Sequence, residues 1–225
     1  MPDQPFSATR PTRRGLLSLA GASLLAGIVA APLLPARASD GENGDPSAAA
    51  TDLIHRYQDA LLDVMRRAEA LSAVERADVL DEAVRATFDF DRMARAAVGR
   101  AWRDADADTQ ERMAEAFAAY SVAVHADRFD GHSGESFHID GTAPGPAGTL
   151  LVNTHIDRPS KAPVILSYVV TQSGDGPRVV DVLMDGSISE VALRRSEWAA
   201  IREREGLSGL IAALKALTGR MLDAA

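Results

Sequence analysis

Two runs rich in β-branched residues, joined by a glycine-containing turn, constrain the fold of this chain most. The runs cover residues 164–172 and 178–184, and Ser173-Gly174-Asp175-Gly176-Pro177 separates them. β-branched residues favour strands, and a short Gly-containing link between two such runs is typical of an antiparallel hairpin. Pro177 stands at the start of the second run, where a missing N–H does least harm to a sheet. The sequence therefore predicts a hairpin at 164–184.

One face of this hairpin is apolar and needs cover from other elements. Because side chains alternate along a strand, Tyr168 and Val170 share a face of the first strand, and Val180, Val182 and Met184 share a face of the second. The long amphipathic helices that precede and follow the sheet can supply the cover. The functional question is whether a packed core or a ligand cavity lies between sheet and helices.

Helical periodicity dominates the chain before the sheet. Apolar residues recur every three or four positions over 48–71 and 74–87, and a shorter helix over 92–98 stops at Gly99. A fourth helix begins after Asp108, where Glu111 three residues later favours a capping box. Its apolar stripe consists of Met113, Phe117, Tyr120 and Val124.

Strand patterns replace helical ones after Phe129. Residues 136–140 and 149–157 read as strands that precede the hairpin, and closing helices over 196–204 and 207–221 are split at Gly206. The order of four helices, four strands and two helices predicts an α+β fold with a four-stranded antiparallel sheet. We assign residues 47–225 to a single domain, because a chain of this length suits one core.

The N-terminus has the pattern of a secretory signal. Arg13 and Arg14 precede an apolar run over 16–34, which ends at Pro35-Ala36-Arg37-Ala38 with small residues flanking Arg37. The paired arginines and the Gly/Ala-rich core favour the twin-arginine route. We predict that 1–38 is a cleaved signal peptide and that 39–46 is a flexible tether. The alternative is a membrane anchor, which the glycines and prolines of the run disfavour.

Composition excludes several classes of function. The chain has no Cys, which excludes disulfides and thiolate nucleophiles. Removal of 1–38 leaves 20 basic and 31 acidic residues, a net charge of −11. An acidic chain of this kind is unsuited to nucleic acid or to anionic lipid surfaces.

Candidate catalytic and metal-binding residues are few. His138 and His155 fall on neighbouring strands, but no third ligand has a convincing position, so we predict no metal site and interpret both as solvent-facing. Asp181 lies in the middle of a strand, where a hydrogen bond to a helix terminus is the preferred role. Ser133 and Ser167 lack a nucleophile elbow, and no phosphate-binding loop is present. We predict no catalytic residues, with an Asp/His hydrolase as a rival.

Several motifs resemble a known family. They are Phe88-Asp89-Phe90-Asp91-Arg92-Met93-Ala94-Arg95, Val98-Gly99-Arg100-Ala101-Trp102, Val179-Val180-Asp181-Val182, Asp185-Gly186-Ser187-Ile188-Ser189 and Gly206-Leu207-Ser208-Gly209-Leu210-Ile211. In this order they resemble the toluene-tolerance, or MlaC-like, family of periplasmic phospholipid-binding proteins, over roughly 48–221.

One branch of that family is more similar still. Residues 129–134, Phe-Asp-Gly-His-Ser-Gly, and residues 187–197 resemble the hopanoid biosynthesis-associated branch called HpnM. Two departures lie near the expected pocket. Pro177-Arg178 stands where the family usually has a Trp, and Ser187-Ile188-Ser189 replaces a Val-Ser-Leu.

The resemblance implies a sheet like that of nuclear transport factor 2, wrapped by helices, with acyl chains between the layers. It implies a periplasmic lipid carrier for phospholipid or hopanoid, with no cofactor, working with membrane-bound donor and acceptor complexes of an ABC-type system. The alternative is a non-enzymatic adaptor subunit of an envelope transport complex without cargo. The expected lipid-binding residues are Val98, Trp102, Met113, Phe117, Tyr120, Val124, Val152, Ile156, Tyr168, Val170, Val182, Met184 and Ile188.

Overall fold

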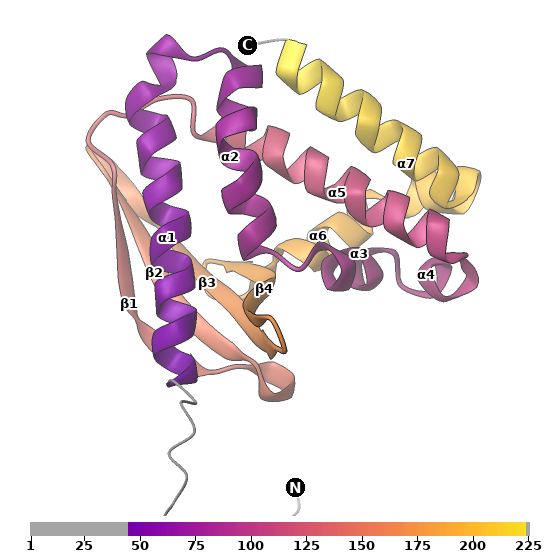
Figure 1. Cartoon of the computed structure of the whole chain (residues 1–225), viewed down its shortest axis with the longest axis horizontal. Helices are drawn as coiled ribbons and strands as arrows, with labels where there is room; N and C mark the ends of the chain where they lie inside the picture. The colour runs from indigo at the N-terminus through magenta and orange to yellow at the C-terminus, as the bar shows by residue number, and fades with distance from the viewer. Residues whose placement is uncertain (1–44, 224–225) are drawn as a thin grey trace, which may run out of the picture. The chain divides into compact units, whose positions relative to one another are not determined.

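Seven α-helices and five strands make up the part of the chain that the structure, a computed structural model, describes: residues 45–223 (Figure 1). Before the sheet come α1 (Pro46–Arg67), α2 (Ala73–Thr87), α3 (Phe90–Val98), α4 (Arg100–Asp104) and α5 (Ala107–Arg128). The strands are β1 (Ser136–Pro144), β2 (Leu150–Arg158), β3 (Lys161–Ser173), β4 (Gly176–Met184) and β5 (Ile188–Ser189), and α6 (Glu190–Glu197) and α7 (Ala199–Asp223) close the chain. The predicted signal peptide and most of the predicted tether lie outside these residues, and α1 begins at Pro46, the tether's last residue.

The sheet is an antiparallel meander in the order β1-β2-β3-β4-β5. The α+β class and the antiparallel sheet are confirmed, but the expected count of four strands is wrong. After β4 the chain reverses through Asp185 and Gly186, both with positive φ (49° and 71°). The turn lets Ile188 pair with Met184 and so creates the short fifth strand.

The hairpin forms where the sequence predicts it, but one valine of β4 faces the core in place of the expected one. Ser173 pairs with Gly176, and Gly176 has a φ of 103°, which a residue with a side chain rarely adopts. The partners then jump from Val170–Val179 to Val169–Asp181, so β4 carries one extra residue. Because of this bulge Val179, at 0% exposure, faces the core in place of the expected Val180.

Helix ends follow local chemistry, although several differ from the prediction. Gly99 and Gly206 have positive φ (62° and 67°), which confirms the expected breaks. The N-cap of α5 is Asp106, whose carboxylate accepts from Thr109 N at 2.7 Å, and the expected cap, Asp108, lies in the first turn. A helix also begins at Glu190, earlier than the expected start at residue 196, because Ser189 caps it.

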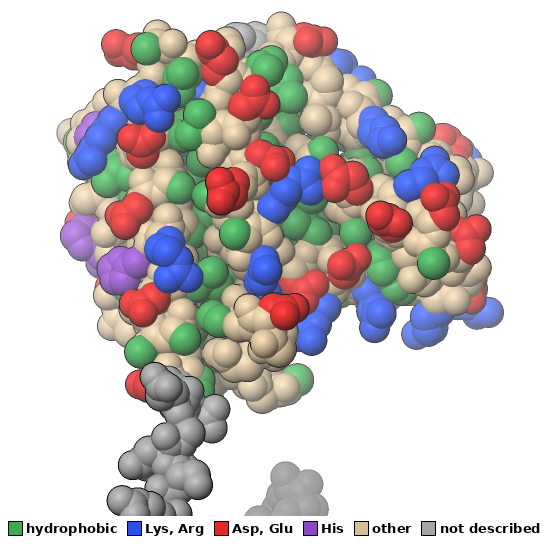
Figure 2. All heavy atoms as spheres, viewed as in Figure 1, with side chains coloured by type: hydrophobic (Ala, Val, Ile, Leu, Met, Phe, Trp, Pro, Cys, Tyr) green, Lys and Arg blue, Asp and Glu red, His purple; other side chains and the backbone are tan. Residues whose placement is uncertain are grey.

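The helices form two packed groups. Figure 1 shows α1 lying along the sheet, whereas α2, α5 and α7 pack on one another beside it. Fully buried aliphatic side chains of both groups, among them Ile54, Leu80, Met113 and Leu210, join one core. Figure 2 shows acidic and basic side chains interspersed on one face of the surface. Within residues 45–223, no helix combines the length and the apolar character that a membrane span requires.

Candidate functional site

A cavity of about 130 Å³ lies between the sheet and the helices. Strands β3 and β4 form one wall, and α1, α3, α5 and α6 form the others. Its apolar lining is Tyr57, Phe88, Phe90, Met93, Phe117, Tyr120, Val124, Phe129, Leu166, Tyr168, Val182 and Met184. Its polar lining is Ser121, His125, Arg128, Glu190 and Arg194. The cavity is therefore mainly apolar, with one polar side built from α5 and α6.

Aromatic rings in edge-to-face contact shape the apolar part. The ring of Tyr57 meets Phe88 at 5.3 Å and Tyr168 at 6.0 Å between centroids, with interplanar angles of 83° and 80°. Phe90 meets Phe117 at 5.7 Å. Such pairs add about 0.5–1.5 kcal/mol beyond the burial of their area. The rings thus form a rigid frame that joins α1, α3, α5 and β3.

The link between α2 and α3 is fixed to the sheet, which places the two phenylalanines. Phe88 forms a parallel bridge with Val179, and Asp89 N donates to Val179 O at 2.9 Å. The Asp89 carboxylate accepts from Arg92 N at 3.0 Å and so caps α3. Because Phe88 and Phe90 flank this anchored residue, both rings reach the cavity.

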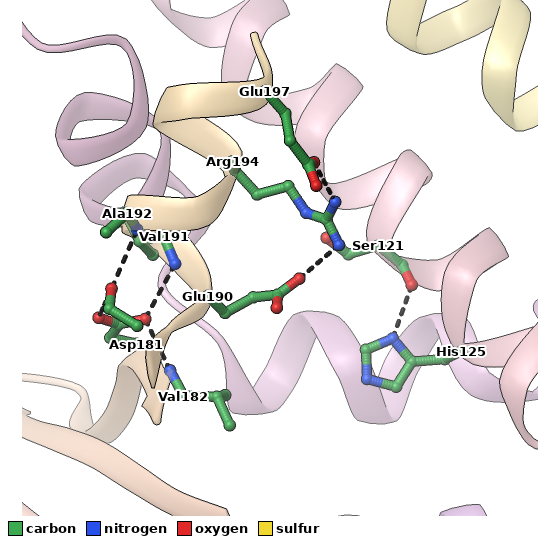
Figure 3. Close-up of polar contacts among 10 residues, drawn as sticks. Ser121, His125, Asp181, Val182, Glu190, Val191, Ala192, Arg194 and Glu197 are labelled. Atoms are coloured by element: carbon green, nitrogen blue, oxygen red, sulfur yellow. Dashed lines mark hydrogen bonds and ion pairs between the residues drawn. The ribbon is translucent and has the colours of Figure 1, made fainter. Parts of the chain in front are cut away.

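His125 and Tyr57 form a hydrogen-bonded pair at the polar side. His125 Nδ1 donates to Ser121 O at 2.6 Å (Figure 3), since a carbonyl can only accept. The Nε2 lone pair therefore accepts from the Tyr57 hydroxyl at 2.5 Å. Burial lowers the pKa of His125 to about 4 and raises the pKa of Tyr57, so both groups are neutral at neutral pH.

Arg194 closes the polar side from α6. Its guanidinium pairs with Glu190 and with Glu197, both at 2.5 Å (Figure 3), and lies 5.5 Å from the centre of the Tyr120 ring. Its side chain is only 9% exposed. A guanidinium so placed is compensated by two carboxylates and an aromatic face, which makes its burial tolerable. No pattern in the sequence distinguished Arg194 from the other arginines.

Asp181 holds α6 in place. Its carboxylate accepts from Val182 N at 2.8 Å and from Val191 N at 3.1 Å (Figure 3). It also accepts from the Ser189 hydroxyl at 2.5 Å. Ser189 in turn caps the helix through Ala192 N. The expected role of Asp181, a hydrogen bond to a helix terminus, is confirmed. The carboxylate is thus occupied in joining β4 to the α6 wall.

The expected lipid-binding residues divide into two groups. Those that line the cavity are Phe117, Tyr120, Val124, Tyr168, Val182 and Met184. Those that lie elsewhere are Val98, Trp102, Met113, Val152, Ile156, Val170 and Ile188. Lipid contact by any of them stays a prediction.

The position of each remaining residue in the fold explains why it does not line the cavity. Val152 and Ile156 belong to β2, against which α1 packs, so no space opens there. Ile188 is 51% exposed on the short strand β5. Val98, Trp102, Met113 and Val170 are buried core residues.

The sequence analysis missed several cavity residues for which a signal existed. Phe88 and Phe90 stand in the Phe-Asp-Phe-Asp motif, and Tyr57 lies on the apolar stripe of the first helix. His125 directly follows Val124. The packing of helices against the sheet determines that these side chains face the cavity.

A second, wider hollow of about 750 Å³ has a different character. Charged side chains dominate its lining, among them Arg85, Arg112, Arg178, Glu115 and Lys215. Several already pair, as Arg85 does with Glu115 at 2.8 Å. Apolar ligands are disfavoured there, so the smaller cavity is the better candidate site.

Comparison with known proteins now identifies the family. The profile of the MlaC protein family matches residues 55–216, most of the chain. The chain belongs to the MlaC family. The match includes every residue that lines the cavity of this MlaC-family chain.

A solved structure shares the fold. The phospholipid-binding protein from Ralstonia solanacearum, solved in complex with a phospholipid, superposes with a TM-score of 0.65 at 17% identity. The match covers 79% of this chain and 99% of that protein. No curated protein matches this MlaC-family chain.

Proposed function

We propose that this chain is a non-enzymatic lipid carrier that shields acyl chains in the cavity between β3, β4 and α3, α5 and α6. The single observation that carries the proposal is the aromatic-framed cavity, located between the layers of an MlaC-family fold. The phospholipid held by the similar Ralstonia protein supports a phospholipid as cargo.

The cavity must widen to accept a lipid. Its volume of about 130 Å³ lies below the roughly 300–1,000 Å³ of common ligand sites. Tyr120, Val124 and Val182 are only half-buried although they line it, so the packing is incomplete there. The α6 wall is attached to β4 through Asp181, which accepts from Val191 N, and to α5 through Arg194, which lies over the Tyr120 ring. We infer that cargo enters by separation of α6 and α5 from the sheet.

The energetics favour exchange between membrane partners. Burial of two chains of about 16 carbons gains about 25 kcal/mol over water, at roughly 0.8 kcal/mol per methylene. A bilayer offers nearly the same gain, so the net free energy of transfer is close to zero. The barrier is passage through water, and a carrier therefore needs a docked donor and acceptor. We propose an ABC-type transport system for these roles.

The N-terminal signal and the HpnM-like motifs extend the proposal to the location and the cargo of the chain. Export by the twin-arginine signal would place the mature chain in the periplasm. The likeness of residues 129–134 and 187–197 to the HpnM branch favours a hopanoid as an alternative cargo. A rigid polycyclic lipid requires a wider opening than flexible acyl chains. The sheet is expected to act as the curved wall, as in nuclear transport factor 2.

The rival function is an adaptor that binds a transport complex and carries no lipid. Native mass spectrometry with lipid extraction separates the two. The mature chain, from Ser39, is purified from its native envelope under gentle conditions and compared with the same sample after lipid is added back. Co-purifying phospholipid or hopanoid supports the carrier. A chain that remains at its bare mass even after lipid is added back contradicts it.

A pair of matched variants locates the lipid. Val124→Trp fills the cavity, whereas Val79→Trp adds the same side chain at a position on α2 that is 40% exposed and outside the cavity. Val124→Trp should retain about tenfold less lipid, since the loss of a few methylene contacts is worth about 1.4 kcal/mol or more. Equal retention by the two variants would place the lipid elsewhere.

A further inference from the structure

Two histidines and an aspartate converge on the outer face of the sheet, away from the cavity. His138 of β1 lies directly opposite His155 of β2 in the antiparallel register, and Asp157 lies two residues further along β2. On β2, Val152, Thr154 and Ile156 are buried, so His155 and Asp157 point to the opposite, solvent-facing side. The register thus brings three side chains that can ligate a metal to one place.

Their atoms are close enough to share one ion. The imidazole rings of His138 and His155 stack, with centroids 4.8 Å apart and planes 16° from parallel. Asp157 Oδ2 lies 3.5 Å from His138 Nε2, and Asp157 Oδ1 lies 3.8 Å from His155 Nε2. One ligand atom from each residue lies within 4.8 Å of the other two. Two ligands of a tetrahedral zinc ion, each at about 2.1 Å, lie about 3.4 Å apart.

A fourth side chain sets the tautomer of His155. His155 Nδ1 donates to Asp140 at 2.8 Å, because the carboxylate can only accept. In the neutral ring Nε2 then carries a lone pair that faces the Asp157 carboxylate, which is also an acceptor. Two acceptors that face each other attract a cation between them. A carboxylate behind a ligating imidazole is the usual support of such ligands.

The β-bulge places this supporting carboxylate. The register of β1 on β2 shifts between Ile139 and Gly141, so Asp140 has no direct partner on β2. Gly141 has a φ of 140°, a conformation that favours glycine. The shift lets Asp140 reach across to the ring of His155. The bulge therefore serves the polar cluster.

We propose that His138, His155 and Asp157 bind one divalent transition-metal ion of the zinc class, with Asp140 as a positioning residue. Imidazole together with carboxylate suits zinc among the divalent ions of the first transition row. Three protein ligands leave a fourth position for water. The ion would join the edge strand β1 to β2, and β1 also contacts the start of α1 through Thr142 and Ser47, whose hydroxyls lie 2.7 Å apart.

Zinc titration of the mature chain, purified without a histidine tag, tests the proposal. Calorimetry should show one saturable zinc ion per chain, and zinc should raise the Tm. His155→Ala and Asp157→Asn should each weaken binding at least about tenfold, and Asp140→Asn should weaken it about 10–100-fold. His55→Ala and His132→Ala are matched controls, since both histidines are exposed and outside the cluster.

The competing explanation is a shared proton that satisfies the same acceptors. In that case no saturable zinc binding is seen, and the proposal is overturned. It is also overturned if His155→Ala binds zinc as the wild type does, or if a control variant abolishes binding. Circular dichroism of each variant without zinc establishes that the fold persists, so a lost site is distinguished from a lost fold.

Discussion

The region around α7 and the region around the cavity are packed to different degrees. On α7, which packs on α5, Leu210 and Leu214 are completely buried. On the other side of the core, Tyr120 and Val124 of the same α5 face Val182 across a cavity and remain half-buried. One helix therefore contributes to a closed core and to an incomplete one. The contrast indicates that the cavity forms where aromatic rings hold the sheet and the helices apart, so that aliphatic side chains do not fill the space between them.

Truncation in the closed region should have the largest effect on stability. Leu210→Ala removes a fully buried side chain from a site without space to relax, and such changes cost about 2–5 kcal/mol. Urea unfolding of the mature chain measures the loss. A cost below about 1 kcal/mol would mean that the region around α7 is no better packed than the cavity.

Acidification should act on the cavity side through His125. The pKa of His125 is lowered to about 4 by burial, from an ordinary value near 6.5 in the unfolded chain. Between pH 6.5 and 4 the unfolded state binds the proton more readily, so stability falls as pH falls through this window. The loss approaches about 3 kcal/mol at its limit.

His125→Gln provides the comparison for this pH effect. Glutamine keeps a polar group near Tyr57 but does not titrate. Urea unfolding at pH 7, 5.5 and 4.5 should show a steeper decline in the wild type than in the variant. Parallel declines would show that His125 is exposed to solvent through the cavity and keeps its ordinary affinity for the proton.

Asp181 joins the sheet to the α6 wall, and its loss should have an intermediate effect. Asp181→Ala removes the acceptor of two backbone N–H groups and of the Ser189 hydroxyl, which should cost about 2 kcal/mol. Asp181→Asn keeps one oxygen acceptor and should cost less. Thermal unfolding ranks the three proteins. If Asp181→Asn lowers the Tm as much as Asp181→Ala does, then charge and not hydrogen bonding holds α6 in place.

The α+β architecture could be predicted from the sequence because short stretches of the chain determine its helices, strands and turns. The hairpin at Ser173–Gly176 and the breaks at Gly99 and Gly206 follow from backbone freedom that only glycine supplies. The role of Asp181 was predicted as the preferred of two, since a charged residue in mid-strand faces either water or a buried partner. These features depend on a few neighbouring residues.

The boundaries of the site were less predictable because they depend on packing between distant elements. Val152 belongs to an apolar strand face as Tyr168 does, but α1 packs against β2, and only Tyr168 reaches the cavity. Nothing in the Val-Val-Asp-Val run at 179–182 predicts the bulge that turns Val179 inward. The start of α6 was not predicted, because its N-cap, Ser189, directly follows the strand pattern in the sequence.

The smallest expected effect on stability is that of a truncation in the cavity. Val182→Ala removes two methyl groups from a half-buried side chain that already borders empty space, so it should cost about 1 kcal/mol or less. Val179→Ala, at a fully buried position three residues earlier on β4, is the matched change and should cost about twice as much. Urea unfolding compares the two.

Lipid retention gives a second comparison of the same two variants. If the cavity receives lipid, Val182→Ala should change the amount of lipid retained with little loss of stability, whereas Val179→Ala should lower stability with little change in the lipid retained. If the two changes cost the same, the packing around Val182 is closed, and the cavity has no advantage over the rest of the core as a site for acyl chains.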